Sequence, residues 1–352
     1  MKYYLAGIKG KKMTILACLL SDLGYDVVGY EDEEYSSEIL NSKGIVVYNN
    51  ILDLNEDCIV VYDDLEEGHR VFLKSKELNL KVYNYSDMIE KLVRKFDTIC
   101  VSGCHGKTTV SNMLKTAIDS NYIIDNNSMG NKESNYFIYE EDNINNDYEP
   151  EYIIITSMEP NNMDNYQGID DMINKYQEYA NKSSKMVIAC GDDPYTHTLN
   201  VNKQIFYYGV NEDNDITVRD IEYLESGTNF DVYVEDEYYG HFELPIYGKY
   251  MLLNALASIA ICHYERMDAK EISKKLKEFN YLNEEISDNI IIKSNAKSNI
   301  ELKSLIKGIK QKYPEKNICV VNSAFEKIED VIYINNSEIN KYKDHVIINL
   351  EG

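Results

Sequence analysis

The chain carries the stretch Gly103-Cys104-His105-Gly106-Lys107-Thr108-Thr109, and the rest of the sequence is interpreted outward from it. It follows an apolar run at 98–101, typical of a strand. It precedes a segment in which apolar residues recur at helical spacing. A glycine-rich loop between a strand and a helix is the context of a phosphate loop. Glycines let the backbone approach phosphate oxygens, and the helix N-terminus directs amide groups at the anion.

This loop predicts two chemical roles. Lys107 is expected to contact the outer phosphates of ATP, and the Thr108 hydroxyl is expected to bind Mg²⁺. A strict phosphate-loop pattern would need glycine at position 101, where this chain has Val101, so the loop is a variant. The alternative is a glycine-rich turn that only begins a helix. Cys104 is interpreted as a threonine-like filler, because no His/Asn partner set for a nucleophile accompanies it.

Strand-like and helix-like patterns alternate before and after the loop, which predicts parallel α/β sheets. Residues 1–96 form the first expected domain, with Asp87 capping its last helix. Residues 97–282 form the second, with a β-rich patch at 216–244. Residues 283–352 are short for a domain and are expected to make a small α/β layer. The Asp/Asn/Glu-rich stretch at 140–149 is expected to be a mobile loop.

The composition excludes several classes of protein. The 352 residues include 36 basic and 60 acidic side chains, a net charge of −24, which argues against nucleic acid as a partner. No apolar run approaches the ~18 residues of a membrane span, so no membrane insertion is expected. The seven cysteines are odd in number and lack CxxC spacing, which favours a reducing, cytoplasmic location.

The heptapeptide resembles the GTHGKTT loop of the Mur ligases, in the form found in the subgroup that adds L-alanine to UDP-N-acetylmuramate. These are cytoplasmic, ATP- and Mg²⁺-dependent enzymes of peptidoglycan synthesis. The resemblance implies a Rossmann-like UDP-binding domain, then a central ATPase domain with a phosphate loop and a parallel sheet. A Rossmann-like amino-acid-binding domain follows, here truncated. The order matches the three expected domains.

The opening residues extend the resemblance, because GIKGKKM at 7–13 is similar to the family's GIGGxGM. Gly7 and Gly10 are kept, while Lys9 and Lys12 replace glycines. The match implies that this turn binds the UDP-sugar. Lys9, Lys11 and Lys12 form a local basic cluster that is interpreted as a pyrophosphate contact, with a solvated loop as the equal alternative. Glu31 lies about 20 residues after Gly10 in the sequence, which is the spacing of the acidic residue that contacts a ribose in dinucleotide-binding folds.

Three later stretches also resemble family motifs. GDDP at 191–194 is similar to N-x-DDP, and YGVNEDND at 208–215 is similar to YGxxEDAD. GKYMLLNA at 248–255 is similar to GxHNVLNA, in which the asparagine contacts adenine. That match places Asn254 at the adenine. It also places Tyr250 where the family has a histidine near adenine, and stacking of the tyrosine ring could tolerate this change.

Other positions depart from the family pattern. The family's magnesium-binding glutamate has its nearest counterparts at Glu140, Glu141 and Asp142, in an uncertain register. Thr156 and Glu159 match the TNIE motif, but the Asp-His pair that follows it is Asn161-Asn162 here. Asparagine is a weaker ligand than imidazole for the second Mg²⁺. The third domain lacks recognisable motifs for holding L-alanine.

Two main functions follow from the resemblance, and a ligase with a changed amine acceptor is a third, weaker alternative. The first is an ATP-dependent ligase that joins a UDP-N-acetylmuramate-type carboxylate to an amino acid through an acyl phosphate. Its implied catalytic residues are Lys107, Glu140 and Glu159, with Thr108 and Glu140 on the metal. The second is a nucleotide-binding regulator or scaffold that has lost activity and acts beside cell-wall synthesis proteins. The Asn161-Asn162 change and the short tail favour the second, and the intact GKTT fits both.

Overall fold

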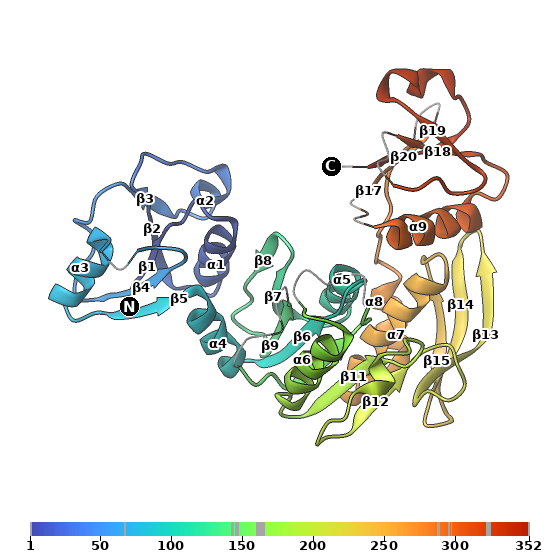
Figure 1. Cartoon of the computed structure of the whole chain (residues 1–352), viewed down its shortest axis with the longest axis horizontal. Coiled ribbons are helices and arrows are strands. Elements are labelled where there is room, and N and C mark those ends of the chain that lie inside the picture. The colour runs from blue at the N-terminus through green and yellow to red at the C-terminus, as the bar shows by residue number, and fades with distance from the viewer. Residues whose placement is uncertain are drawn as a thin grey trace. The chain divides into compact units, whose positions relative to one another are not determined.

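The computed structural model describes residues 2–66, 68–141, 144, 148–159, 166–286, 289–294, 296, 298–321 and 325–350 (Figure 1). The chain divides into two compact units. One comprises Met1–Ile188 with Thr198–Ile205, and the other comprises Ala189–His197 with Phe206–Gly352. Among the described residues, no helix is long and apolar enough to span a membrane. All seven cysteines are described and free, and six of them are buried.

The first unit begins with a five-stranded parallel sheet, shown in blue in Figure 1. Its strands are β1 (Lys2–Ala6), β2 (Asp26–Tyr30), β3 (Val46–Tyr48), β4 (Cys58–Tyr62) and β5 (Lys81–Asn84), in the order β3-β2-β1-β4-β5. Its helices are α1 (Lys11–Asp22), α2 (Glu38–Ser42), α3 (Arg70–Glu77) and α4 (Tyr85–Lys95). The strand order reverses at β1, so the loop after β1 lies where such sheets bind ligands. The expected Rossmann-like fold is confirmed.

The expected cap of α4 was wrong by one turn. Asn84 is the N-cap, and its side chain accepts a hydrogen bond from the Asp87 amide at 2.8 Å. The Asp87 carboxylate accepts from the Asn84 amide in return, at 3.3 Å. Asp87 is therefore the third helical residue of a capping box.

A second sheet of the first unit carries the heptapeptide. Its strands are β6 (Asp97–Ser102), β7 (Ser120–Ile124), β8 (Asn127–Met129), β9 (Tyr136–Glu140) and β10 (Tyr152–Ile155), in the order β10-β6-β9-β7-β8. All run parallel except β8. Helices α5 (Lys107–Ala117) and α6 (Ile169–Asn181) belong to this part, and β11 (Met186–Cys190) lies next to β10 in the strand order. Because β6, β9 and β10 are neighbours and parallel, the residues after them meet at one edge.

The expected mobile loop at 140–149 was wrong at its start. Glu140 is the last residue of β9, and Glu140 and Glu141 are both buried. Their burial follows from the pairing of β9 with β6, in which Val101 lies opposite Glu140. Residues 142–143 and 145–147 lie outside the described part of the chain.

The second unit contains the expected β-rich patch, an antiparallel meander. It consists of β13 (Ile216–Leu224), β14 (Gly227–Val234) and β15 (Glu237–Leu244), and β12 (Ile205–Tyr208) pairs with β13. Helices α7 (Lys249–Tyr264) and α8 (Ala269–Leu276) follow. A short 3₁₀ turn, η2, covers Thr196–Thr198.

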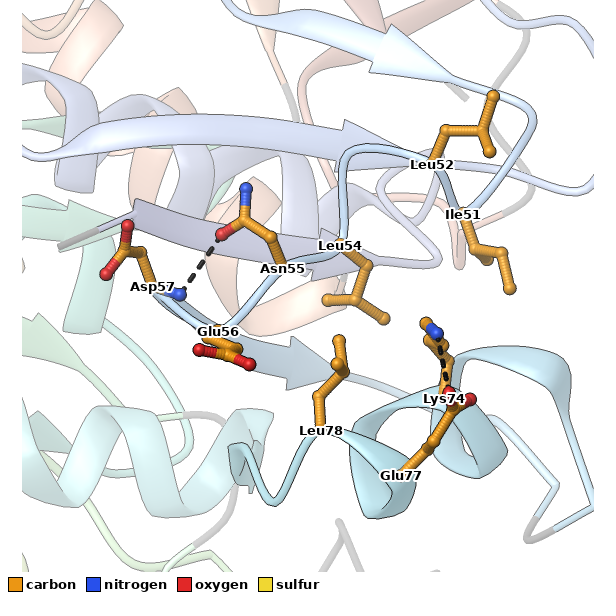
Figure 2. A pocket seen from close by; sticks show the side chains of 9 residues that line it. All are labelled: Ile51, Leu52, Leu54, Asn55, Glu56, Asp57, Lys74, Glu77 and Leu78. Carbon is orange, nitrogen blue, oxygen red and sulfur yellow. Dashed lines mark hydrogen bonds and ion pairs between the residues drawn. The ribbon is translucent and has the colours of Figure 1, made fainter.

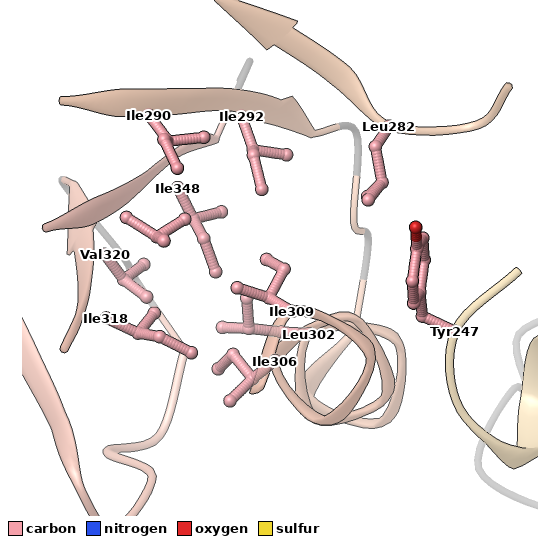
Figure 3. Close-up of a cluster of buried hydrophobic side chains, with 11 residues drawn as sticks. Tyr247, Leu282, Ile290, Ile292, Leu302, Ile306, Ile309, Ile318, Val320 and Ile348 are labelled. Atoms are coloured by element: carbon pink, nitrogen blue, oxygen red, sulfur yellow. The ribbon is translucent and has the colours of Figure 1, made fainter. Parts of the chain in front are cut away.

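The chain ends in a third sheet, in the order β16-β17-β20-β18-β19. Its elements are β16 (Asn283–Ile286), β17 (Ile290–Ser294), α9 (Asn299–Lys312), β18 (Ile318–Val321), β19 (Val331–Ile334), η3 (Asn336–Lys341) and β20 (Val346–Leu350). All its strands pair in parallel except β16 with β17. Figure 3 shows Leu302, Ile306 and Ile309 of α9 facing the aliphatic side chains of the sheet. The expected α/β layer is confirmed.

Candidate active site

The phosphate loop begins and ends with glycines in conformations that other residues rarely adopt. Gly103 has φ 128°, and Gly106, the N-cap of α5, has φ 82°. A Cβ on Gly103 would overlap the Thr156 hydroxyl and lie 2.9 Å from the Ser157 amide nitrogen. Glycine at 103 therefore lets β6 and the end of β10 approach each other.

The end of β10 holds this loop through hydrogen bonds. The Cys104 amide donates to the Ser157 carbonyl at 3.1 Å, and the His105 amide donates to the Ser157 hydroxyl at 3.0 Å. The Thr156 hydroxyl lies 2.5 Å from the His105 carbonyl. These bonds fix the backbone ahead of α5, whose N-terminal amides are available for an anion.

Lys107 and Thr108 occupy the first turn of α5. The Lys107 ammonium donates to the Gly103 carbonyl at 2.9 Å, so it bends back over the loop. The Thr108 hydroxyl donates to Glu140 Oε1 at 2.6 Å. The structure thus brings three of the predicted residues together from two separate segments of sequence.

Glu140 is buried at the end of β9. Its Oε2 accepts from the Asp125 amide at 3.0 Å. Burial raises the pKa of the Glu140 carboxyl, and the Thr108 hydrogen bond and the Lys107 charge partly oppose this. A hydroxyl and a carboxylate side by side are hard oxygen donors suited to Mg²⁺, so this pair fits the expected metal.

Glu141 does not share that position. It follows the last residue of β9, its side chain is buried, and its charge raises the pKa values of Cys100 and Tyr179 rather than meeting Thr108. Glu140 therefore fits the role of the magnesium-binding glutamate whose register the sequence left open.

His105 and Glu159 form a half-buried pair, with Nε2 and Oε2 3.3 Å apart. The Glu159 amide also donates to Cys104 Sγ at 3.2 Å, which agrees with a packing role for that thiol. His105 is therefore held through its backbone amide by Ser157 and through its ring by Glu159. Asn161 and Asn162 lie outside the described residues.

The predicted UDP site lies at the carboxyl edge of the first sheet. Gly7 has φ 78°, and the Lys9 amide donates to Glu31 Oε1 at 2.5 Å. Lys9, Gly10 and Lys12 are exposed, and the Lys12 ammonium lies 5.8 Å from the centroid of the Tyr85 ring. Glu31 therefore contacts the turn itself.

In the second unit, the GDDP and YGVNEDND stretches interlock through one buried carboxylate. Asp192 Oδ1 accepts from the amides of Val210 and Asn211 at 3.1 and 3.2 Å, and from Asn214 Nδ2 at 3.1 Å. Its Oδ2 pairs with the Lys249 ammonium at 2.9 Å. Sequence reasoning treated these residues only as motif matches and assigned them no contacts.

Tyr250 and Asn254, the predicted adenine contacts, lie on α7 in the same unit. The Tyr250 side chain is 49% exposed. Asn254 Nδ2 contacts Met251 Sδ at 3.9 Å, and the Asn254 carbonyl accepts from the Ser258 hydroxyl.

A shallow pocket of about 780 Å³ lies elsewhere, near the start of β4 and the end of α3 (Figure 2). Its lining includes Leu52, Leu54 and Leu78 together with the Lys74–Glu77 ion pair. None of its nine lining residues belongs to the predicted sites. It starts at the amino end of β4, whereas the Gly7 turn follows the carboxyl end of β1.

We expect Gly103→Ala to prevent tight ATP binding and to lower stability by roughly 1–3 kcal/mol, the range for a residue forced into unfavourable backbone geometry. The added methyl must displace Thr156 or Ser157, which hold the loop. Thermal unfolding and calorimetric ATP titration measure the two effects. Gly68→Ala is the control, because a Cβ there meets nothing within 4 Å. Wild-type ATP affinity in Gly103→Ala would contradict the packing argument.

The chain is similar to known proteins over most of its length. Residues 2–97 match the model of the Mur ligase family catalytic domain, and residues 129–262 match the Mur ligase middle domain. UDP-N-acetylmuramate–L-alanine ligase from Lacticaseibacillus casei is 31% identical over 339 residues, which cover 91% of this chain and 77% of that protein. The chain belongs to the Mur ligase family. Mur ligases are ATP-dependent ligases.

Solved Mur ligase structures share the fold. UDP-N-acetylmuramate-alanine ligase from Thermotoga maritima aligns with a TM-score of 0.74 at 16% identity, covering 99% of this chain and 95% of that one. A pseudomurein peptide ligase type C from Methanothermus fervidus aligns with a TM-score of 0.69 at 15% identity, covering 99% and 97%. The predicted α/β class is confirmed.

Proposed function

We propose that this Mur ligase joins the carboxylate of a UDP-N-acetylmuramate-type nucleotide sugar to an L-alanine-like amino acid, with ATP and Mg²⁺, in cytoplasmic peptidoglycan synthesis. The observation that carries the proposal is the meeting of Lys107, Thr108 and Glu140 at the end of a glycine loop. The sequence similarity to an L-alanine ligase supports this choice of substrates.

The reaction has two steps. A substrate carboxylate oxygen attacks the γ-phosphorus of ATP, the bond to the β-phosphate oxygen breaks, and an acyl phosphate and ADP form. The amine nitrogen then attacks the acyl carbon, inorganic phosphate leaves, and the nitrogen loses a proton to give the amide. The work left to the protein is positioning and charge neutralisation.

The residues of the loop have separate roles in this proposal. The first amides of α5, from Lys107 to Thr109, cradle the phosphates, and Lys107 moves from the Gly103 carbonyl to the transferring phosphoryl group. Thr108 and Glu140 hold Mg²⁺, which neutralises charge on the phosphates when bound. Glu159 keeps His105 oriented beside the loop.

The remaining roles are assigned by domain. Residues 1–96 bind the UDP-sugar through Gly7, Lys9, Gly10, Lys12 and Glu31. Residues 97–282 bind ATP, with Tyr250 and Asn254 at the adenine, and residues 283–352 face the amino acid.

The test is a product assay with ATP, UDP-N-acetylmuramate and L-alanine at increasing Mg²⁺. Phosphate release with mass detection of the UDP-linked amide supports the ligase. ATP binding without amide at any Mg²⁺ concentration supports the regulator that Asn161-Asn162 suggests, and it overturns the ligase. Other amino acids, tested in parallel, identify a changed acceptor.

We expect Lys9→Glu with Lys12→Glu to weaken UDP-N-acetylmuramate binding by about tenfold or more, because two charge-assisted phosphate contacts become repulsive. ATP affinity should stay near the wild-type value, because Lys107 and Thr108 lie on the second sheet. Calorimetry with each ligand measures both. Lys76→Glu is the control, because Lys76 is an exposed lysine on α3, a helix of the same expected domain. An unchanged UDP-sugar affinity would favour the solvated-loop interpretation.

A further inference from the structure

Helix α9 approaches the junction that begins α7 unusually closely. A Cβ on Gly308 of α9 would lie 2.8 Å from the Tyr247 carbonyl oxygen, so only glycine permits this distance. Gly248 follows with φ 84° and ψ 161°, a conformation almost confined to glycine. Figure 3 shows Tyr247 beside α9 and the aliphatic core of the last sheet.

Gln311, one turn after Gly308, uses both ends of its amide at this junction. Its Oε1 accepts from the Gly248 amide at 2.6 Å. Its Nε2 donates toward three acceptors in the turn between β13 and β14: Leu224 O at 3.1 Å, Gly227 O at 3.0 Å and Thr228 Oγ1 at 3.3 Å. One acceptor contact and three donor contacts set the orientation of the amide.

This arrangement matters for α7 because Gly248 is its N-cap and offers no side chain. The first amides of a helix need partners from outside it, and Gln311 supplies one. The next residue, Lys249, pairs with the buried Asp192 carboxylate. The first turn of α7 is thus held from α9 and from the GDDP stretch together.

We propose that Gln311 is a positioning residue for ATP: by holding Gly248, it sets the first turn of α7 and couples the last sheet to nucleotide affinity. The inference rests on the proposed function, in which Tyr250 and Asn254 of α7 contact adenine. Gln311 itself touches no substrate.

The test compares Gln311→Met, which keeps the length of the side chain without its hydrogen bonds, with Lys307→Met on the exposed face of the same helix. We expect the Gln311 variant to raise the Kd and KM for ATP about tenfold, the equivalent of one to two lost hydrogen bonds. Its kcat at saturating ATP and its UDP-N-acetylmuramate affinity should remain near wild type. Amide exchange at 248–252 should become faster.

Three results would overturn the proposal. They are an ATP Kd equal to that of Lys307→Met, an equal loss of affinity for both nucleotides, and unchanged amide exchange at 248–252. If Gln311→Met does not fold, Gln311→Lys, which keeps a donor for the turn between β13 and β14 and loses the acceptor for Gly248, is judged by the same results. If the wild-type protein does not bind ATP, the proposed function and the Gln311 proposal are both overturned. If the wild-type protein binds ATP and one of the three results above is found, only the Gln311 proposal is overturned.

Discussion

Lys107→Ala is expected to reduce phosphate release by about 10²–10³-fold, the effect of removing one preorganised charge donor from a transition state. The ammonium already lies over the loop, 2.9 Å from the Gly103 carbonyl, and needs only to change acceptor when ATP binds. Loss of its charge-assisted contact should also weaken ATP binding by roughly 1.5–3 kcal/mol. Steady-state kinetics and calorimetry measure the two effects.

Lys115→Ala is the matched control, because Lys115 lies two turns later on α5 and contacts the Tyr122 ring rather than the loop. It should retain wild-type ATP affinity. Equal ATP affinity in Lys107→Ala and wild type would remove the phosphate-loop assignment and leave the glycine-rich turn as the interpretation.

Glu140→Gln is expected to lower turnover by about 10²-fold or more at millimolar Mg²⁺, because a neutral amide is a poor ligand for a hard cation. Part of the activity should return at higher Mg²⁺, since weaker sites fill at higher concentration. A magnesium titration of the initial rate measures this. An unchanged magnesium requirement would exclude Glu140 as the metal ligand.

The same variant should be more stable than wild type in the absence of Mg²⁺ at neutral pH. Burial raises the pKa of Glu140 above its ordinary value, so the folded state binds this proton more tightly than the unfolded state does. Stability from this group is therefore highest at low pH and declines as pH rises through the ordinary pKa to the folded one. The Gln oxygen accepts from the Asp125 amide and the Gln nitrogen donates to the Thr108 hydroxyl, so both contacts are satisfied without the charge. Thermal unfolding measured from pH 4 to 7 should show that the stability difference between Glu140→Gln and wild type widens as the pH rises.

Much of the fold could be predicted because its strands are short apolar runs between turn residues. The run at 58–62 became β4, and the alternation of strands and helices implied parallel sheets. Helix α6 was missed, although its buried Met172, Tyr176 and Tyr179 repeat at helical spacing. The strand β16 was missed because its residues, NEEI, carry more charge than apolar surface.

The candidate site was predictable only where one segment supplied it. The loop from Gly103 to Thr109 could be recognised as a unit, but three consecutive acids at 140–142 left the register of the magnesium-binding glutamate open. The pairing of β9 with β6 brings Glu140 to Thr108, and sequence alone did not give this strand register. The Asp125 amide and the contacts of Gln311 come from distant segments, so no local pattern could indicate them.

The interlock around Asp192 has an evolutionary consequence. A Cβ on Gly191 would overlap the Asn214 amide, and a Cβ on Gly209 would overlap the Asp192 carboxylate, so each glycine makes room for a polar group of another stretch. A substitution at any of these four positions leaves a clash or a buried polar group without its partner. Among homologues, substitutions at these positions should therefore occur in compensating pairs, and the two stretches should vary together.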